Sequence, residues 1–244
     1  MNRFFIDPER LSGGCVDIPD DISGQIRKVL RLKEGEAVQF LDNQGWVYDA
    51  EISYPDPKHV TAVVTGKQPA EGEPSCFVTL YLALTQREKF EWILQKCTEA
   101  GVSRVVPMIT ERTIVRKSAD ASGKQERWEK ILKEAAEQCE RARIPELLPS
   151  VPLKQAVSMG AEADLPIFCY EDERHTTLKD LVDPKRGNIR TASLMVGPEG
   201  GFAPAEAEYI QQHGWNSCTL GDRIYRVETA AIAGVILTLY EVGR

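Results

Sequence analysis

The sequence lacks the cysteine and histidine patterns that mark several classes of enzyme. Its six cysteines, at positions 15, 76, 97, 139, 169 and 218, include no C-x-x-C pair, which argues against a zinc site and against thioredoxin-like chemistry. We expect no metal, and reduced thiols as in the cytoplasm. The three histidines, at positions 59, 175 and 213, stand in no motif, so a histidine-based nucleophilic triad has no support.

Long apolar runs and phosphate-binding signatures are missing as well. No stretch approaches the roughly 20 apolar residues of a membrane span, and residues 1–7 lack the apolar region of a signal peptide. The glycine-rich stretch Gly197–Gly201 is not followed by the Lys-Ser/Thr pair of a P-loop, and it does not read G-x-G-x-x-G. We therefore expect no membrane association and disfavour a nucleoside triphosphate or dinucleotide ligand.

Acidic residues outnumber basic ones, and the net charge of −7 argues against a uniformly basic nucleic-acid binder. The distribution is uneven, however. The stretch Arg104–Lys133 holds eight basic and four acidic residues, and a second basic cluster comprises Arg27, Lys28, Arg31 and Lys33. These clusters favour an RNA-binding surface, and the alternative is a solvated helix face with weak ion pairs.

The first part of the chain reads as a small β domain over residues 1–68, with one helical stretch at Asp21–Leu32. A linker rich in proline and glycine follows at residues 69–75. The turn sequence at Asp42–Gly45 separates two of the predicted strands. The four predicted strands are Arg3–Ile6, Val38–Asp42, Trp46–Ile52 and Val60–Thr65.

The second part, residues 76–244, alternates strands with helices, which predicts an α/β fold with a mainly parallel sheet. Its predicted strands are Phe77–Leu84, Arg104–Met108, Pro166–Tyr170, Ala192–Val196 and Ser217–Leu220. Its predicted helices are Lys89–Ala100, Gly123–Arg143, Leu153–Met159, Thr177–Val182, Pro204–Gln212 and Glu228–Tyr240. The last helix is apolar almost all round, which indicates burial against the sheet or a partner.

Two late segments carry the most specific pattern. One reads GPEGGF from Gly197, the other reads LGDRIYRVETA from Leu220, and each follows a predicted strand. With these segments the chain resembles the SPOUT methyltransferases, and it is most similar to the bacterial 16S ribosomal RNA uridine-N3 methyltransferase family. FFIDPERL, KVLRLKEGE, EKFEWILQKCTEAGV, TERTIVR and EQCERARIP agree with that family. Tyr225 and Val227 stand where the family usually has Leu and Thr.

The resemblance implies an architecture and an activity. The N-terminal domain would be a PUA-like RNA-binding β-barrel, and the C-terminal domain a SPOUT fold whose last helix threads a deep trefoil knot. The enzyme would be a homodimer that transfers a methyl group from S-adenosyl-L-methionine to N3 of a uridine in the 16S rRNA of the small ribosomal subunit. Two alternatives stay open: methylation of another RNA position such as a ribose 2′-hydroxyl, and a non-catalytic RNA-binding assembly factor.

The resemblance also assigns residues to the methyl donor, because its segments 194–201 and 219–229 match the binding loops of the family. Glycines in such loops let the backbone turn sharply and approach a ligand closely. The expected cofactor-binding residues are Leu194, Val196, Gly197, Glu199, Gly200, Gly201, Leu220, Gly221, Ile224, Tyr225, Arg226 and Thr229. The expected RNA-binding residues are Arg3, Arg27, Lys28, Arg31, Arg112, Arg116 and Arg141.

The chemistry of uridine N3 suggests which residues act in catalysis. Its proton is about as weakly acidic as a phenol, with a pKa near 10, so transfer to an ordinary glutamate is uphill by about 8 kcal/mol. A guanidinium that stabilises the uridinate anion would reduce this difference. We predict that Arg226 has this role, and Glu199 and Glu228 are the carboxylate candidates for the base.

Overall fold

The computed structural model describes residues 1–11, 13–55, 59–113 and 121–243. The chain divides into two compact units. Unit 1 comprises Met1–Glu73 and Ala136–Ile144, and unit 2 comprises Pro74–Ala135 and Pro145–Arg244. Within the described ranges, no helix is both long enough and apolar enough to cross a membrane.

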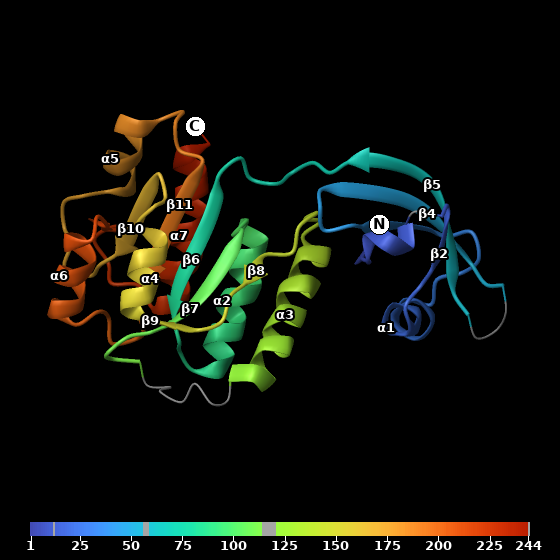
Figure 1. Cartoon of the computed structure of the whole chain (residues 1–244), viewed down its shortest axis with the longest axis horizontal. Coiled ribbons are helices and arrows are strands. Elements are labelled where there is room, and N and C mark those ends of the chain that lie inside the picture. Colours follow the sequence, from blue (N-terminus) through green and yellow to red (C-terminus); the bar gives the residue numbers. More distant parts are fainter. Residues whose placement is uncertain (12, 56–58, 114–120, 244) are drawn as a thin grey trace. The chain divides into compact units, whose positions relative to one another are not determined.

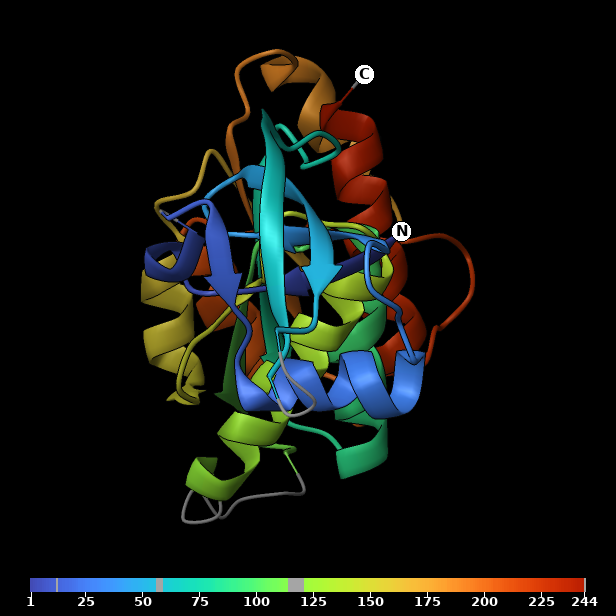
Figure 2. The ribbon, with the colours of Figure 1, turned by 90° about the vertical axis from the view of Figure 1, so that its right-hand side faces the viewer.

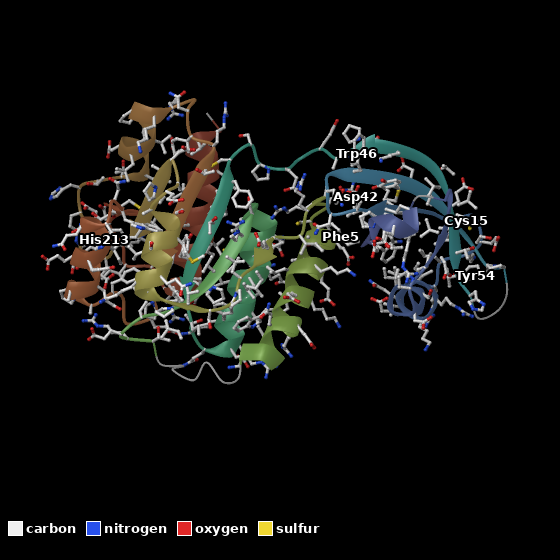
Figure 3. The ribbon with its side chains drawn as sticks, viewed as in Figure 1. Phe5, Cys15, Asp42, Trp46, Tyr54 and His213 are labelled. Atoms are coloured by element: carbon white, nitrogen blue, oxygen red, sulfur yellow. The ribbon has the colours of Figure 1, made fainter. Side chains whose placement is uncertain are left out.

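Unit 1 is built on a five-stranded sheet with the order β1-β3-β4-β5-β2. The β1–β3 pair is parallel, and the other three pairs are antiparallel. The strands are β1 (Asn2–Phe5), β2 (Cys15–Asp17), β3 (Ala37–Leu41), β4 (Trp46–Ser53) and β5 (Thr61–Pro69). The turn predicted between β3 and β4 is held by Asp42, whose carboxylate accepts hydrogen bonds from the backbone N–H groups of Gln44 and Trp46 (Figure 3).

One face of this sheet packs against a helical segment (Figure 2). The segment begins as α1 (Asp20–Gly24) and widens into the π-type turn η2 (Gln25–Leu30). A short 3-10 turn, η1 (Pro8–Leu11), lies between β1 and β2. Ile22 and Ile26 point from the segment into a core that includes Phe4 and Phe40. The segment ends where Arg31 adopts the left-handed backbone conformation, with φ of 54°.

The other face of the sheet is covered by residues 136–144. In the chain, this segment is separated from the rest of unit 1 by Pro74–Ala135 of unit 2. Phe5, Leu41 and Val47 pack there against Ala136 and Ala142. The prediction that one helix runs from Gly123 to Arg143 is wrong at its end, because α3 (Ala121–Gln138) stops before Glu140, whose φ is 64°. A left-handed residue ends the helical hydrogen-bond pattern.

Unit 2 contains a parallel sheet with the order β12-β10-β11-β6-β7-β8, and β9 also pairs with β7 (Figure 1). All six of its recorded strand pairs are parallel, so the predicted α/β fold with a mainly parallel sheet is confirmed. The strands are β6 (Phe77–Ala83), β7 (Arg104–Ile109), β8 (Glu146–Leu147), β9 (Val151–Pro152), β10 (Leu165–Cys169), β11 (Thr191–Val196) and β12 (Asn216–Cys218).

Helices cover both faces of this sheet. The helical elements are α2 (Arg87–Ala100), α3, α4 (Leu153–Gly160), α5 (Leu178–Val182), η4 (Asp183–Lys185), α6 (Pro204–Gln212) and α7 (Val227–Val242). On one face, α4 and α6 enclose a core around Tyr81, Phe168 and Trp215. On the other face, α7 packs against α2 and against strands β6 and β11.

The close approach of α7 to the sheet depends on Gly234. A β-carbon at this position would lie 2.8 Å from Cδ2 of Leu194, which is fully buried on β11. Because α7 lies this close to β11, it fixes the position of the strand end from which the glycine-rich turn departs. The trefoil knot that the resemblance implies stays a prediction.

Candidate functional site

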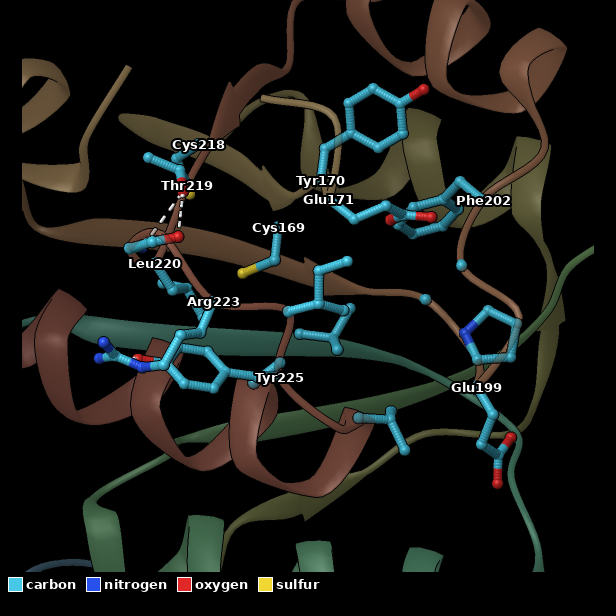
Figure 4. A pocket seen from close by; sticks show the side chains of 18 of the residues that line it. Cys169, Tyr170, Glu171, Glu199, Phe202, Cys218, Thr219, Leu220, Arg223 and Tyr225 are labelled. Carbon is cyan, nitrogen blue, oxygen red and sulfur yellow. Dashed lines mark hydrogen bonds between the residues drawn. The ribbon is translucent and has the colours of Figure 1, made fainter. Parts of the chain in front are cut away.

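A cavity of about 280 Å³ opens at the carboxyl ends of three neighbouring strands, β12, β10 and β11 (Figure 4). Ligands of parallel α/β sheets bind at this edge, and the volume is near the lower end of the range for small-molecule sites. The residues that line it are Cys169, Tyr170, Glu171, Arg174, Val196, Gly197, Pro198, Glu199, Gly200, Gly201, Phe202, Cys218, Thr219, Leu220, Gly221, Arg223, Ile224, Tyr225, Val227 and Ala230.

The glycine-rich turn after β11 forms one wall, and its shape requires glycine at position 201. Gly201 has φ of 66°, and a β-carbon there would lie 1.9 Å from Oε1 of Glu171. Gly197 is also crowded, because its β-carbon would lie 3.2 Å from the Phe202 ring. Gly200 is different: a β-carbon there would be in ordinary contact, 3.5 Å from Arg112. The backbone therefore depends on glycine at position 201 and much less at position 200.

Arg112 holds the same turn from outside. Its Nη1 donates hydrogen bonds to the carbonyl oxygens of Gly200, at 2.7 Å, and Phe202, at 3.3 Å. The neighbouring N–H of Glu111 donates to the carboxylate of Glu206, which also accepts from the N–H of Ala203 at the start of α6. Arg112, which we predicted to contact RNA, therefore supports the glycine-rich turn.

Glu199 projects from this turn toward the start of α2. Its carboxylate accepts a hydrogen bond from Lys89 Nζ at 3.0 Å. Burial alone would raise the pKa of Glu199, but hydrogen bonds from its own backbone N–H and from Lys89 outweigh burial and hold the pKa below its usual value. A carboxylate stabilised in this way is a poor proton acceptor, which argues against Glu199 as the base.

The segment after β12 forms the opposite wall. The Thr219 hydroxyl accepts from the N–H of Gly221 and donates to its carbonyl, which closes a tight turn. The guanidinium of Arg223 lies 5.9 Å from the centre of the Tyr225 ring and donates to its hydroxyl at 3.3 Å. Figure 4 shows this pair and Glu199 at opposite ends of the cavity.

Two thiols from neighbouring strands lie between these walls. Cys169 on β10 and Cys218 on β12 are partners in the strand register, and both line the cavity. A hydrogen bond with Cys218, together with burial, raises the pKa of the Cys169 thiol well above its usual value. The Cys169 thiol is therefore uncharged at neutral pH.

The structure brings most of the predicted cofactor residues together. Nine of them line the cavity: Val196, Gly197, Glu199, Gly200, Gly201, Leu220, Gly221, Ile224 and Tyr225. Three do not: Leu194 is fully buried beneath α7, while Arg226 and Thr229 are exposed at the start of that helix.

Sequence reasoning missed the contribution of β10. Cys169, at the end of this strand, and Tyr170, Glu171 and Arg174, in the loop after it, all line the cavity. The signal was present, because the predicted strand Pro166–Tyr170 leads directly into charged residues, as the two recognised loops follow their own strands. Applying the strand-end rule to every predicted strand would have found them.

The two other predicted catalytic residues flank Val227, which lines the cavity. Arg226 is exposed and forms no ion pair with any described residue, including Glu228. Glu228 is half-buried, and its Oε2 is buried with no hydrogen-bond partner in the described part of the chain. An exposed guanidinium and a carboxylate with one buried, unpaired oxygen therefore lie next to the cavity lining.

The predicted RNA-binding residues of unit 1 differ in their surroundings. Arg27, Lys28 and Arg31 are exposed around η2 in unit 1 and can reach a ligand. Arg3 donates to the carbonyl of Glu140 at 2.7 Å, and Arg141 is only 7% exposed and forms an ion pair with Glu73 at 2.8 Å. Burial of Arg141 in this pair corrects the expectation that it lies on the RNA-binding surface.

Arg116 lies outside the described residues. So does the middle of the basic stretch Arg104–Lys133 of which it is part. Within the described part of that stretch, Arg104 pairs with Glu146 and Arg127 pairs with Glu91. These two basic residues therefore form surface ion pairs, which is the alternative to an RNA-binding role.

The cavity suits a ligand such as S-adenosylmethionine, which carries no phosphate. The sides of the cavity are apolar at Val196, Leu220 and Ile224, and the backbone of the glycine-rich turn is accessible because Gly201 carries no side chain. Glu171 adds a carboxylate that has no cation within salt-bridge distance among the described residues. A cavity with apolar sides, a few polar groups and one carboxylate without a paired cation suits a positively charged ligand that is partly apolar.

Comparisons with known proteins agree with this arrangement. A family model described as the RNA methyltransferase domain matches residues 72–238, and a model for the PUA domain of RNA methyltransferases matches residues 26–65. Ribosomal RNA small subunit methyltransferase E of Synechocystis sp. is 31% identical over 93% of this chain and 74% of its own length. The protein of the same name from Bacillus subtilis is 29% identical over 99% and 97% of the two chains.

A solved structure is similar over both units. The crystal structure of ribosomal RNA small subunit methyltransferase E from Neisseria gonorrhoeae, bound to S-adenosyl methionine, aligns with a TM-score of 0.88 at 31% identity. The alignment covers 98% of this chain and 97% of that chain.

Proposed function

The chain belongs to the family of RNA methyltransferases that carry a PUA domain, and from this premise we propose that it methylates N3 of a uridine in the 16S rRNA of the small ribosomal subunit, with S-adenosylmethionine as the donor. The relatives with the same domain arrangement are named for methylation of small-subunit rRNA. The observation that carries the proposal is the cavity at three strand ends, bounded by the glycine-rich turn and by the segment from Thr219 to Tyr225.

Different residues around the cavity would contact different parts of the donor. Gly197 and Gly201 leave the backbone open to close approach, and Val196, Leu220 and Ile224 offer apolar contact. Glu171 would face the positive charge of the donor. When bound, S-adenosylmethionine supplies an electrophilic methyl group on a sulfonium.

We assign the preparation of the uridine to the residues beside the cavity. Arg226, exposed and without an ion-pair partner among the described residues, stabilises the negative charge that develops when N3 loses its proton. Glu228 replaces Glu199 as the carboxylate of choice for the base, because its Oε2 makes no hydrogen bond in the described structure whereas Glu199 is committed to Lys89. Holding the reacting atoms about 3–3.5 Å apart then accelerates transfer.

We further propose that the enzyme is a homodimer that acts in the cytoplasm. Trp92 on α2 is 52% exposed, and Ile236 and Tyr240, one turn apart on α7, are 49% and 56% exposed. Because α2 and α7 pack side by side, we infer that these side chains contribute to one exposed apolar patch of the kind that marks an interface. The exposed Arg27, Lys28 and Arg31 of unit 1 provide contacts for the rRNA backbone.

Calorimetric titration of the full chain with S-adenosylmethionine, ATP and NAD tests the donor assignment. We expect saturable binding of S-adenosylmethionine and no binding of ATP or NAD. Transfer of a labelled methyl group to purified small ribosomal subunits, followed by nucleoside analysis, tests the target. Binding of a nucleotide in place of S-adenosylmethionine would refute the donor assignment, and a label on a ribose 2′-hydroxyl would refute N3 as the target.

A further inference from the structure

A second cavity, of about 580 Å³, lies entirely within unit 1. It is bounded by the face of the sheet that residues 136–144 partly cover and by the chain that follows β5. The residues that line it are Arg3, Gln39, Val47, Gln68, Pro69, Glu71, Gly72, Cys139, Glu140 and Arg141.

A row of polar side chains crosses the sheet at this cavity. Arg3 on β1 is the register partner of Gln39 on β3, which is the register partner of Asp49 on β4. The carboxylate of Asp49 accepts a hydrogen bond from Nε2 of Gln39 at 2.8 Å and one from Nε2 of Gln68 at 3.1 Å. Because a carboxylate only accepts, it orients both amides with their N–H groups toward Asp49 and their oxygens away from it.

Two atoms of this row have no partner. Oε1 of Gln39 and Nε of Arg3 are both buried, and neither forms a hydrogen bond with any described residue. Gln39 as a whole is only 8% exposed. A buried donor and a buried acceptor that are both unpaired cost free energy, which a small movement of the two side chains toward a ligand with complementary groups would recover.

The basic side chains at the cavity are already paired with carboxylates. The guanidinium of Arg3 contacts Glu140, and that of Arg141 pairs with Glu73. Glu71 adds a further carboxylate to the lining. The cavity therefore disfavours a phosphate group and favours an uncharged ligand that carries adjacent hydrogen-bond donors and acceptors.

We propose that this cavity binds a single unpaired nucleobase of the RNA substrate, with Gln39 and Arg3 reading its edge. Proteins recognise single-stranded RNA through splayed-out bases whose edges meet side-chain amides and guanidinium groups. The exposed Arg27, Lys28 and Arg31 of the same unit would bind phosphates independently of sequence. The inference rests on the proposed function only in taking RNA, not a peptide, as the ligand.

The test is the binding of the full chain to four labelled hexanucleotides, each made of one base, measured by fluorescence anisotropy without S-adenosylmethionine. We expect one base to bind more tightly than the others. Gln39→Leu should reduce this preference by roughly 5- to 150-fold, the discrimination that one two-point base contact provides. The salt dependence of affinity should not change, because Gln39 carries no charge.

The same substitution at the exposed Gln25, Gln25→Leu, is the matched control and should keep the preference. Gln68→Ala, at an exposed position on the same cavity, provides a second variant if Gln39→Leu does not fold, and it should also weaken the preference. Photo-crosslinking of a 4-thiouridine hexanucleotide should place the adduct within residues 68–72 or 139–141.

Equal affinity for the four hexanucleotides, or a preference unchanged in Gln39→Leu and Gln68→Ala, would overturn the proposal. So would binding of an uncharged hexapeptide that competes for the cavity while RNA crosslinks elsewhere. Base-selective binding by a protein that neither binds S-adenosylmethionine nor transfers a methyl group would leave this inference standing and refute the proposed function alone.

Discussion

At the scale of single residues, the missing β-carbon of Gly201 determines the shape of the candidate donor site. Its φ of 66° lies in the left-handed region, and a β-carbon would overlap the carboxylate of Glu171. We expect Gly201→Ala to lower the free energy of unfolding by about 1–3 kcal/mol, the cost of a strained backbone residue, and to weaken S-adenosylmethionine binding. Chemical denaturation and calorimetry measure the two effects.

Gly200→Ala is the matched control for this prediction. A β-carbon at position 200 meets only ordinary contacts with Arg112. The free energy of unfolding of this variant should therefore differ from that of the parent chain by less than about 1 kcal/mol. Equal destabilisation by the two substitutions would contradict our description of the turn.

The second prediction at this scale concerns Arg226. On the proposed mechanism, Arg226→Ala keeps donor binding but lowers kcat by roughly 10²- to 10³-fold, as expected for loss of one group that stabilises a developing anion. The pH–rate profile should also move to higher pH, because N3 must then ionise without assistance. Arg226→Lys, which keeps the charge, should recover part of the rate. A wild-type rate and pH profile in Arg226→Ala would remove this residue from catalysis.

At the scale of secondary structure, local patterns predicted the long elements and missed three of the shortest strands. The prediction for α6, Pro204–Gln212, coincides with the helix observed, since Pro204 suits the first helical turn. Strands β2, β8 and β9 were not predicted. They span only two or three residues each and form through pairing with distant strands, so their own sequences carry little signal.

The candidate site shows the same division. Residues in the two glycine-bearing loops were found because their motifs are specific. The strand-end rule would have nominated Glu171, but its place between the two loops depends on β10 lying between β12 and β11 in the sheet, and strand order is not encoded in any local pattern. The burial of Arg141 against Glu73 also joins residues far apart in the chain, so a basic residue predicted at a surface proved to be structural.

One loop contact leads to a prediction about pH. Glu173, after β10, accepts hydrogen bonds from the Ser217 hydroxyl on β12 and from the N–H groups of Thr176 and His175. These bonds, that from Ser217 foremost, lower the pKa of Glu173 from 4.5 to about 2. A depressed pKa stabilises the fold above the unfolded-state value, and this stabilisation is lost as the pH falls from about 4.5 to about 2.

Glu173→Gln should therefore lose about 1–3 kcal/mol of stability at pH 7. The stability of this variant should also depend less steeply on pH than that of the parent chain between pH values of about 4.5 and 2. Urea denaturation at several pH values measures both quantities. Ser217→Ala, which removes one donor, should give an intermediate result. Identical pH dependence in the parent chain and Glu173→Gln would show that the contact adds nothing to stability.

At the scale of the whole molecule, the exposed apolar patch on α2 and α7 predicts self-association. Light scattering should give about twice the 27.3 kDa mass of one chain for the parent protein. Ile236→Glu places a charge in the patch and should yield the mass of a single chain. Met159→Glu, at an exposed residue of α4 on the opposite face of the sheet, is the control and should remain a dimer. A parent chain that is monomeric at micromolar concentration would contradict the interface.

Methylation of uridine N3 in small-subunit rRNA can be tested by nucleoside mass spectrometry of 16S rRNA from a strain that lacks this protein. We expect 3-methyluridine to disappear from the digested rRNA and to return when the parent chain is expressed, but not when Arg226→Ala is expressed. An unchanged amount of 3-methyluridine in the deletion strain, or loss of a different methylated nucleoside, would contradict it.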